Sequence, residues 1–459
     1  MQSKECILTI DFGSTFTKVT GIEINGESAE ILGTAKAFTT IESDIRDGLN
    51  TALERLYATT GEINFSQKLA ASSAGGGLKM VAVGLVPALT SKASLMAACS
   101  AGAKVVKTFS YEMTTAEADE VFHINPDLVL LSGGTDGGNK AVLLHNAAKL
   151  APVERDFAVI VAGNKVVSEE AAEILAKGNK LVKICENVMP AFGELNILPA
   201  KAAIRDLFME KIIEAKGLGE AAKMMDIPII PTPLAVYEAA LLLSENLGSL
   251  IAVDVGGATT DVYSMCDGKP TRRGIVQKGL QEPYAKRSVE GDLGMRYSLE
   301  ALTDVASPEV LASMAGFETY KQNCLADPSY LPQGEFAEYD RLLCGEAVSI
   351  AVERHCGRLE RVYTPMGEQY YQYGKDLSEV KYVLGLGGPI VYSHDPQGIL
   401  TKALASAETA EILKPKSPAF LIDKKYIFAA CGLLARVNKA AAVSLMKQEI
   451  TPIGGKYGT

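Results

Sequence analysis

An aspartate followed by a turn of small residues occurs near the start of the chain. Asp11 comes at the end of an apolar run, and Gly13, Ser14 and Thr15 follow it. Small residues let backbone N–H groups approach oxygen anions such as phosphate, and a carboxylate beside them can hold Mg²⁺, usually through water. Lys18 could add a positive charge, although strand alternation leaves the direction of its side chain open. Taken alone, the segment is equally well explained as a hairpin with a polar turn.

The same arrangement occurs a second time in the chain. Asp254 ends another apolar run, and Asp261 follows across the turn, where it could orient a water molecule or touch a metal. The residues between them are small or hydroxylated: Gly256, Gly257, Ala258, Thr259 and Thr260. Two such turns that face each other would clamp a polyphosphate. We therefore expect Asp11, Asp254 and Asp261 to be the catalytic carboxylates, with the first two at the metal; the alternative is a coincidence of two hairpins.

A third glycine-rich segment follows an apolar strand pattern at residues 382–384. Gly385, Gly387 and Gly388 would allow the backbone to approach the flat ring or ribose of a nucleotide. The alternative is an ordinary turn between a strand and a helix.

Alternating strands and helices are expected around these segments. Residues 1–65 have the pattern of a strand, a turn, a second strand and a helix. Between residues 66 and 190, apolar runs lead into glycine-bearing turns at 75–77, 133–134 and 163–164, and helical patterns follow. This repetition indicates a parallel α/β sheet. The expected segments are a first lobe at 1–65 and 191–249, an inserted α/β domain at 66–190, a second lobe at 250–425, and a final helix and tail at 426–459.

Composition narrows the function classes. The chain has 459 residues and a net charge of −10, so the broad basic footprint of a nucleic-acid-binding protein is missing, although a small basic patch around Arg272 and Arg273 stays open. The weakly polar stretch 78–99 contains Lys79 and Lys92 and is a poor membrane span. No secretory signal is visible, and the eight cysteines form no C-x-x-C pair. We expect a cytoplasmic protein with neither nucleic-acid nor membrane partners.

One glycine-rich segment resembles a P-loop but lacks a required residue. Residues 132–140 space two glycines as a P-loop does, yet Asn139 stands where the lysine is needed. We expect a surface turn that fixes packing or contacts a partner.

The order of these parts resembles the actin/Hsp70/sugar-kinase ATPase superfamily. The matching parts are residues 11–15 and 254–261 as two phosphate motifs, 385–388 as the adenosine motif, and 233–240 and 429–434 as helices that connect two lobes. The resemblance implies an α/β fold with two actin-like (ribonuclease H-like) ATPase lobes, an inserted parallel α/β domain in the first lobe, and ATP with Mg²⁺ in the cleft between the lobes. The chain departs from the chaperone branch at Thr232, where that branch carries a carboxylate.

A narrower resemblance covers nearly the whole chain. Residues 71–87, 131–138 and 191–199 resemble the accessory protein of glutamate (methylaspartate) mutase, the MutL/GlmL type. This resemblance implies an ATP-dependent, chaperone-like factor that reactivates a coenzyme B12-dependent mutase or aminomutase, with a possible small second subunit. Two alternatives stay open: a small-molecule kinase with the same cleft, and a nucleotide-gated scaffold with negligible turnover.

Overall fold

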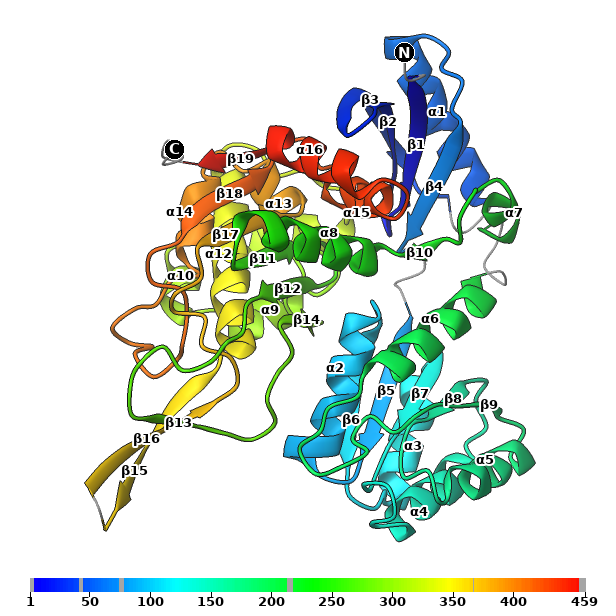
Figure 1. The fold of residues 1–459 in the computed structure, drawn as a ribbon. Helices are drawn as coiled ribbons and strands as arrows, with labels where there is room; N and C mark the ends of the chain where they lie inside the picture. Colours follow the sequence, from blue (N-terminus) through cyan, green and yellow to red (C-terminus); the bar gives the residue numbers. More distant parts are fainter. Residues whose placement is uncertain (1–3, 41–43, 74–77, 213–217, 366, 454–459) are drawn as a thin grey trace. The chain divides into compact units, whose positions relative to one another are not determined.

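The computed structural model describes residues 4–40, 44–73, 78–212, 218–365 and 367–453 (Figure 1). The glycine turn expected at 75–77 lies outside these ranges. The chain divides into two compact units. Unit 1 comprises residues 1–25, 30–235 and 279–281, and unit 2 comprises residues 26–29, 236–278 and 282–459.

The first sheet of unit 1 contains the first aspartate-turn segment. Its strands are β1 (Glu5–Phe12), β2 (Phe16–Asn25), β3 (Ser28–Phe38), β4 (Gln67–Ser72) and β10 (Ile230–Pro231), in the order β10-β4-β1-β2-β3. Strands β1 and β2 pair antiparallel, whereas β4 pairs parallel with both β1 and β10. Helix α1 (Ile45–Thr60) joins β3 to β4, and Asp44 caps it by accepting a hydrogen bond from the backbone N–H of Arg46.

The main sheet of unit 2 repeats this strand order, read from its other edge, and adds one strand, β19. Its strands are β11 (Leu250–Val255), β12 (Thr260–Met265), β14 (Ala285–Glu290), β17 (Tyr382–Leu386), β18 (Ala419–Asp423) and β19 (Ile450–Ile453), in the order β14-β12-β11-β17-β18-β19. Strand β11 pairs antiparallel with β12 and parallel with β17, and β17 pairs parallel with β18. In both sheets the first strand of the motif is therefore central, with a hairpin partner on one side and parallel strands on the other.

A separate parallel sheet is inserted between β4 and β10. Its strands are β5 (Lys79–Gly84), β6 (Lys104–Ser110), β7 (Leu128–Leu131), β8 (Ala158–Val161) and β9 (Leu181–Ile184), in the order β6-β5-β7-β8-β9, and every pair is parallel. Its helices are η2 (Pro87–Ser91), α2 (Lys92–Ser100), α3 (Thr115–Ile124), α4 (Ala141–Leu150) and α5 (Ser168–Lys177). The predicted inserted parallel α/β domain is confirmed.

The turn after β7 is fixed by one asparagine of its own and by two from the segments after β8 and β9. Asn139 Oδ1 accepts a hydrogen bond from Val142 N at 3.1 Å and so caps α4. Asn164 Oδ1 accepts from Gly137 N at 3.1 Å, and Asn187 Nδ2 donates to Gly134 O at 3.0 Å. Asn139 therefore has a capping role here, as one expects for asparagine.

Helices complete both units. Unit 1 also contains α6 (Leu198–Ile212) and α7 (Leu218–Lys223), and helix α8 (Thr232–Leu247) begins in unit 1 and continues into unit 2. Unit 2 contains α9 (Leu299–Val305), α10 (Pro308–Ala312), α11 (Phe317–Ala326), α12 (Glu335–His355), α13 (Gly388–Val391), α14 (Pro396–Thr401), α15 (Phe428–Ala435) and α16 (Lys439–Glu449). A small second sheet has strands β13 (Ile275–Lys278), β15 (Arg358–Thr364) and β16 (Gly367–Tyr373) in the order β13-β16-β15.

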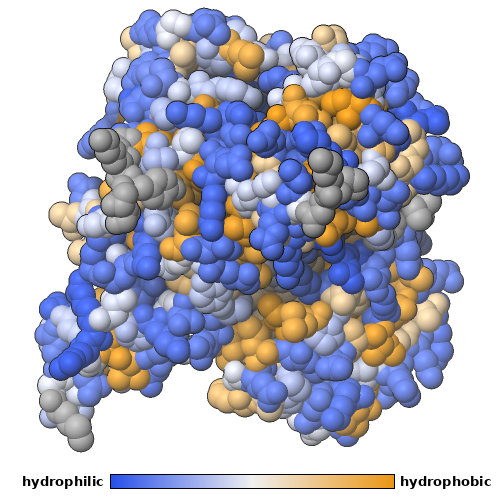
Figure 2. All heavy atoms as spheres, turned by 45° about the horizontal axis from the view of Figure 1, so that its top comes forward, coloured by the Kyte–Doolittle hydropathy of each residue, from blue (hydrophilic) through white to orange (hydrophobic). Residues whose placement is uncertain are grey.

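Each unit has its own apolar interior. Strand β11 contributes Ile251, Val253 and Val255 to the core of unit 2, where α12 packs through residues such as Leu343 and Ala347. On the face shown in Figure 2, hydrophilic side chains prevail and hydrophobic ones gather in separate patches. Within the described ranges, no helix combines the length and apolar character needed to cross a bilayer.

Candidate functional site

The first aspartate-turn segment forms a tight hairpin between β1 and β2. Asp11 is the penultimate residue of β1, and it pairs in register with Lys18 on β2. Gly13 N donates to Phe16 O at 3.1 Å, and a Cβ on Gly13 would lie only 2.6 Å from that oxygen. A larger residue would therefore force this turn apart, which explains the glycine.

The carbonyl groups of the first turn are tied back by one threonine. Thr39 Oγ1 donates to Gly13 O at 2.8 Å, and Thr39 N donates to Thr15 O at 3.0 Å. Within the described part of the chain, the backbone N–H groups of Ser14 and Thr15 have no acceptor. With two of its carbonyl oxygens occupied and these N–H groups available, the turn is suited to an anionic ligand.

Asp11 also contacts the start of helix α8. Strand β10 pairs with β4, two positions from β1 in the sheet, and Thr232 follows β10 as the first residue of α8. Thr232 Oγ1 donates to Asp11 Oδ1 at 2.6 Å. Thr232 occupies the position at which the chaperone branch carries a carboxylate. Its hydroxyl thus contacts Asp11, the aspartate that we expect at the metal.

The second hairpin repeats the geometry with a different partner across the strands. Asp254 is the penultimate residue of β11, and its register partner on β12 is Asp261. Directly opposed like charges destabilise a strand pair. Arg287 on β14 offsets this repulsion, because its Nη2 and Nε donate to Asp261 Oδ1 at 2.7 and 3.0 Å. The side chains of Arg287 and Asp261 are 2% and 11% exposed, so this ion pair is buried.

The carbonyl groups of the second turn are likewise occupied. The four turn carbonyls accept as follows: Gly256 O from Met295 N, Gly257 O from Arg296 N and Tyr297 N, Ala258 O from Ser298 Oγ, and Thr259 O from Gly256 N. Within the described residues, the N–H groups of Gly257, Ala258 and Thr259 have no acceptor. The second turn therefore also has N–H groups available to an anionic ligand.

The segment that holds the second turn is fixed by an ion cluster. Thr260 Oγ1 donates to Leu293 O at 2.6 Å, and Arg354 Nη1 donates to Glu290 Oε2 at 2.9 Å and to Asp292 Oδ1 at 2.8 Å. Burial raises the pKa of Glu290, and the Arg354 guanidinium opposes this shift. A rigid support beneath the turn keeps its N–H groups in place.

The third glycine segment lies at the same sheet edge as Asp254. Leu386 at the end of β17 is the register partner of Asp254. Gly387 has φ +84°, and a Cβ there would lie 2.1 Å from Val255 O and 2.8 Å from Asp254 Oδ1. Gly388 begins α13. Gly385, in contrast, is packed within β17, where a Cβ would lie 2.8 Å from Ile390 Cγ2.

The predicted residues thus gather into two groups. Unit 1 brings together Asp11, Gly13, Ser14, Thr15 and Lys18, and unit 2 brings together Asp254, Gly256, Gly257, Ala258, Thr259, Thr260, Asp261, Gly387 and Gly388. Sequence reasoning missed Thr39, Arg287 and residues 295–298. No local pattern marks these residues, because each acts from a separate element.

Metal-ligating side chains are sparse in both groups. Within the described residues, three or more His, Cys, Asp or Glu side chains nowhere gather in a way that could hold a metal ion. Mg²⁺ in nucleotide sites is commonly held by one or two carboxylates together with phosphates and water. Asp11 and Asp254 offer carboxylate oxygens of that kind.

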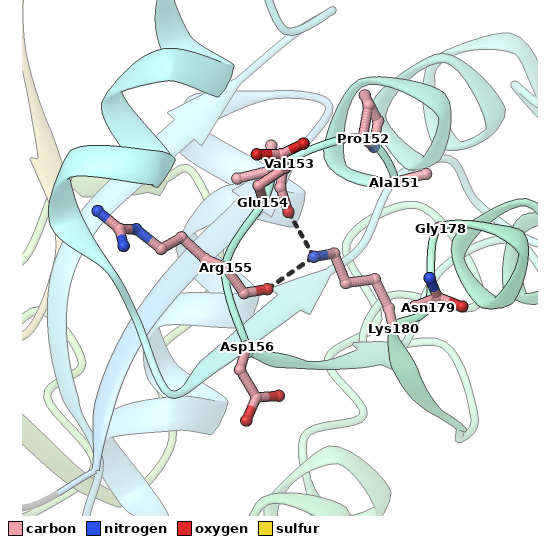
Figure 3. Close-up of a pocket in the computed structure, with 9 residues that line it drawn as sticks. All are labelled: Ala151, Pro152, Val153, Glu154, Arg155, Asp156, Gly178, Asn179 and Lys180. Carbon is pink, nitrogen blue, oxygen red and sulfur yellow. Dashed lines mark hydrogen bonds between the residues drawn. The ribbon is translucent and has the colours of Figure 1, made fainter.

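A depression of about 450 Å³ in the inserted domain is a separate feature (Figure 3). Lys180 Nζ donates there to Val153 O at 2.5 Å and to Arg155 O at 2.7 Å. The depression lies where β8 and β9 begin, whereas ligands of parallel sheets bind at the carboxyl ends of strands. Its lysine is also already committed to two carbonyl groups, so we do not assign the functional site to it.

A family profile and one relative both identify the same protein family. The profile of the family described as MutL protein matches residues 7–450. Protein MutL of Clostridium tetanomorphum is 45% identical over 463 residues, which cover 98% of this chain and 100% of the relative.

Solved structures give weaker matches. A nucleotide-free acetone carboxylase is 13% identical with a TM-score of 0.42, covering 94% of this chain and 70% of its own. A glycerol dehydratase reactivase is 10% identical with a TM-score of 0.38, covering 94% and 99%. Xylulose kinase from Bifidobacterium adolescentis is 11% identical with a TM-score of 0.32, covering 99% and 95%. These TM-scores are too low to carry an argument, so the strand order decides the fold.

Two sheets with the same strand order, each with an aspartate and an N–H-presenting turn at its central hairpin, define an actin-like (ribonuclease H-like) ATPase fold with an inserted parallel α/β domain. The family is equally well supported, because the profile matches residues 7–450 and the relative aligns with 98% of this chain. The chain belongs to the MutL protein family.

Proposed function

We propose that this protein is an ATP-dependent, chaperone-like factor that reactivates a coenzyme B12-dependent mutase, glutamate mutase or a related aminomutase, with ATP and Mg²⁺ as its ligands. One observation carries the nucleotide part: two turns, each beginning two residues after an aspartate near the end of a strand, have backbone carbonyl groups occupied and N–H groups available. Membership of the MutL family supports the mutase part.

Each group of residues has a distinct part in this proposal. The N–H groups of Ser14, Thr15 and residues 257–259 bind phosphate oxygens, as donors aimed at fixed anions do. Asp11 and Asp254 hold the hydrated Mg²⁺, which when bound neutralises phosphate charge. Gly387 and Gly388 leave room for the nucleoside. Ionised Asp261 can accept a hydrogen bond from the attacking water, and Arg287 fixes its position.

The proposed mechanism couples the nucleotide to the partner protein. Hydrolysis of ATP to ADP would change what the two turns contact, and α8 would transmit the change because its first residue, Thr232, touches Asp11. The inserted domain, and possibly a small second subunit, would transfer this change to the mutase and release damaged cobalamin. We expect the protein to act in the cytoplasm, a compartment in which thiols such as those of its eight cysteines stay reduced.

The decisive experiment is a reactivation assay. A purified B12-dependent mutase is inactivated by turnover and then supplied with fresh cofactor, with or without this protein and ATP. We expect activity to return only when both are present. Asp261→Ala should abolish ATP hydrolysis; unchanged hydrolysis would refute its assigned role.

A small-molecule kinase is the alternative. In a kinase, ADP release depends on an acceptor hydroxyl, whereas a reactivating factor hydrolyses ATP slowly by itself and responds to its protein partner. ADP formation that strictly requires a metabolite and ignores the mutase would favour the kinase.

A further inference from the structure

The small sheet of β13, β15 and β16 is exposed on both of its faces. Gln372 is the only residue of these three fully described strands that is buried. In Figure 1 the β15–β16 hairpin projects from the rest of unit 2. A three-stranded sheet ordinarily needs an apolar face packed on something to be stable. The nucleotide site uses no residue of this sheet, which we call the tyrosine sheet.

The tyrosine sheet exposes aromatic rings on both faces. The exposed fractions of Tyr363, Tyr370 and Tyr373 are 72%, 39% and 36%, and that of Val276 is 43%. Tyr370 and Tyr373 lie on opposite faces, because their positions in β16 differ by an odd number. Tyrosine supplies a large contact area at low conformational cost and is enriched where proteins bind proteins.

Positive charge prevails in this sheet and in the loop that precedes β13. The exposed cations of the sheet and of the loop that precedes β13 are Lys269, Arg272, Arg273, Lys278, Arg358 and Arg361; the exposed acids of the same segments are Asp267, Glu360 and Glu368. The local balance is therefore positive, although the chain as a whole carries −10. Arg361 stacks over Tyr363 at 5.5 Å, and Lys278 lies 4.7 Å over the Tyr371 ring. The complementary surface is acidic.

We infer that the tyrosine sheet is a docking surface for an acidic face of the partner mutase. This inference rests on the proposed function. Tyrosine and arginine are the residues that most often dominate binding energy in protein interfaces, and a cationic rim accelerates association with an acidic partner. Glu360 and Glu368 lie on the same strands and would repel a polyanion such as RNA. The binding partner is therefore expected to be a protein surface.

The test measures binding of the full-length protein to a purified B12-dependent mutase. Tyr363→Ala/Tyr370→Ala should raise Kd at least tenfold while leaving ATP hydrolysis unchanged. Arg272→Glu/Arg273→Glu, at two exposed loop positions, should also raise Kd about tenfold, and more at low salt than at high salt. Leu331→Ala is the control, since Leu331 is 74% exposed in unit 2 and lies outside the tyrosine sheet; its Kd should not change.

The outcomes separate the two proposals. If the wild-type protein binds the mutase and both double variants bind equally well, the docking inference is overturned and the proposed function stands. If the wild-type protein neither binds nor reactivates the mutase, the proposed function fails and takes the inference with it. Loss of binding to a single-stranded RNA oligonucleotide, or a changed oligomeric state, in variants that keep full mutase affinity would overturn the inference in favour of another occupant.

Discussion

The two central hairpins share a topology but differ in what faces the strand-end aspartate. Asp11 has Lys18 as its register partner, whereas Asp254 has Asp261. The first hairpin thus places opposite charges across its strands, and the second places like charges there. The second hairpin compensates with a buried cation from a third strand, Arg287. The same motif therefore occurs twice in this chain with different internal electrostatics.

The two turns also differ in the residues that support them. A single residue, Thr39, holds the first turn, and a whole segment, residues 295–298, holds the second. The first hairpin is additionally bonded to a helix through Thr232, whereas the donors to the second turn come from the segment between β14 and α9. The second turn therefore has the more extensive support of the two.

The largest effect should come from removing the buried cation of the second hairpin. Arg287→Leu leaves Asp261 buried without its partner, so we expect the free energy of unfolding to fall by about 3–5 kcal/mol. The equivalent change in the first hairpin, Lys18→Met, should cost less than about 1 kcal/mol, because Lys18 is only partly buried. Urea denaturation measures both, and similar losses would remove the contrast between the hairpins.

A double variant sharpens this comparison. Asp261→Asn/Arg287→Leu removes both charges, so it should recover most of the stability that Arg287→Leu alone loses. ATP hydrolysis should be absent in the double variant, as we expect for Asp261→Ala. Recovery of hydrolysis would contradict the role that we give to Asp261.

The next largest effect should come from Gly387, where the backbone closely approaches Val255. Gly387→Ala places a Cβ 2.1 Å from Val255 O at φ +84°, so we expect about 1–3 kcal/mol of destabilisation and at least a tenfold rise in the Kd for ATP. Gly274→Ala is the control, since Gly274 has a similar φ of +81° but nothing lies within 4 Å of the Cβ that it would gain. Calorimetric titration with ATP compares them; equal affinities would show that the approach at Gly387 is unimportant.

The hydroxyl contact of the first hairpin should have a smaller effect. Thr232→Val removes a hydrogen bond to a carboxylate, worth about 1.5–3 kcal/mol, and leaves Asp11 less fixed. We expect the Mg²⁺ dependence of ATP binding to shift to roughly tenfold higher metal concentration. Thr232→Ser keeps the hydroxyl and should behave as wild type. If valine and serine behave alike, the contact has no part in binding.

The smallest effect concerns pH and is confined to unit 2. His355 is buried between Ser288 Oγ and Ser264 Oγ at 2.7 and 2.8 Å, and burial lowers its pKa well below 6.5. The unfolded chain binds a proton near pH 6.5 and the folded chain does not, so this contribution is present above pH 6.5 and is lost as pH falls below it. The histidines of unit 1, His123 and His145, are not buried.

Urea denaturation at several pH values checks this expectation. The wild-type protein should lose about 1.4 kcal/mol of stability per pH unit below pH 6.5 through this residue. His355→Gln should lack that slope. An identical pH dependence in both proteins would show that His355 does not set it.

Much of each half-site could be predicted from local sequence. The positions of Asp11, Asp254 and their turns follow from apolar runs that end at an acidic residue and a glycine, because strand and turn chemistry act over a few residues. Thr232 was marked as a departure from a related pattern, but its contact with Asp11 depends on β10 lying beside β4. Arg287 and Thr39 carried no signal, since their roles depend on which strand or loop becomes a neighbour.

The sequence by itself determined the class of this protein: two copies of one hairpin motif, an inserted parallel domain, and the residue types that phosphate and Mg²⁺ require. Local patterns suffice for this, because hydrophobic period and turn residues act between near neighbours in the chain. Only the tertiary structure decided which groups stabilise those residues, such as Arg287 on Asp261 and the donors that occupy the turn carbonyls. Such partners come from distant segments, and sheet order and register alone bring them together.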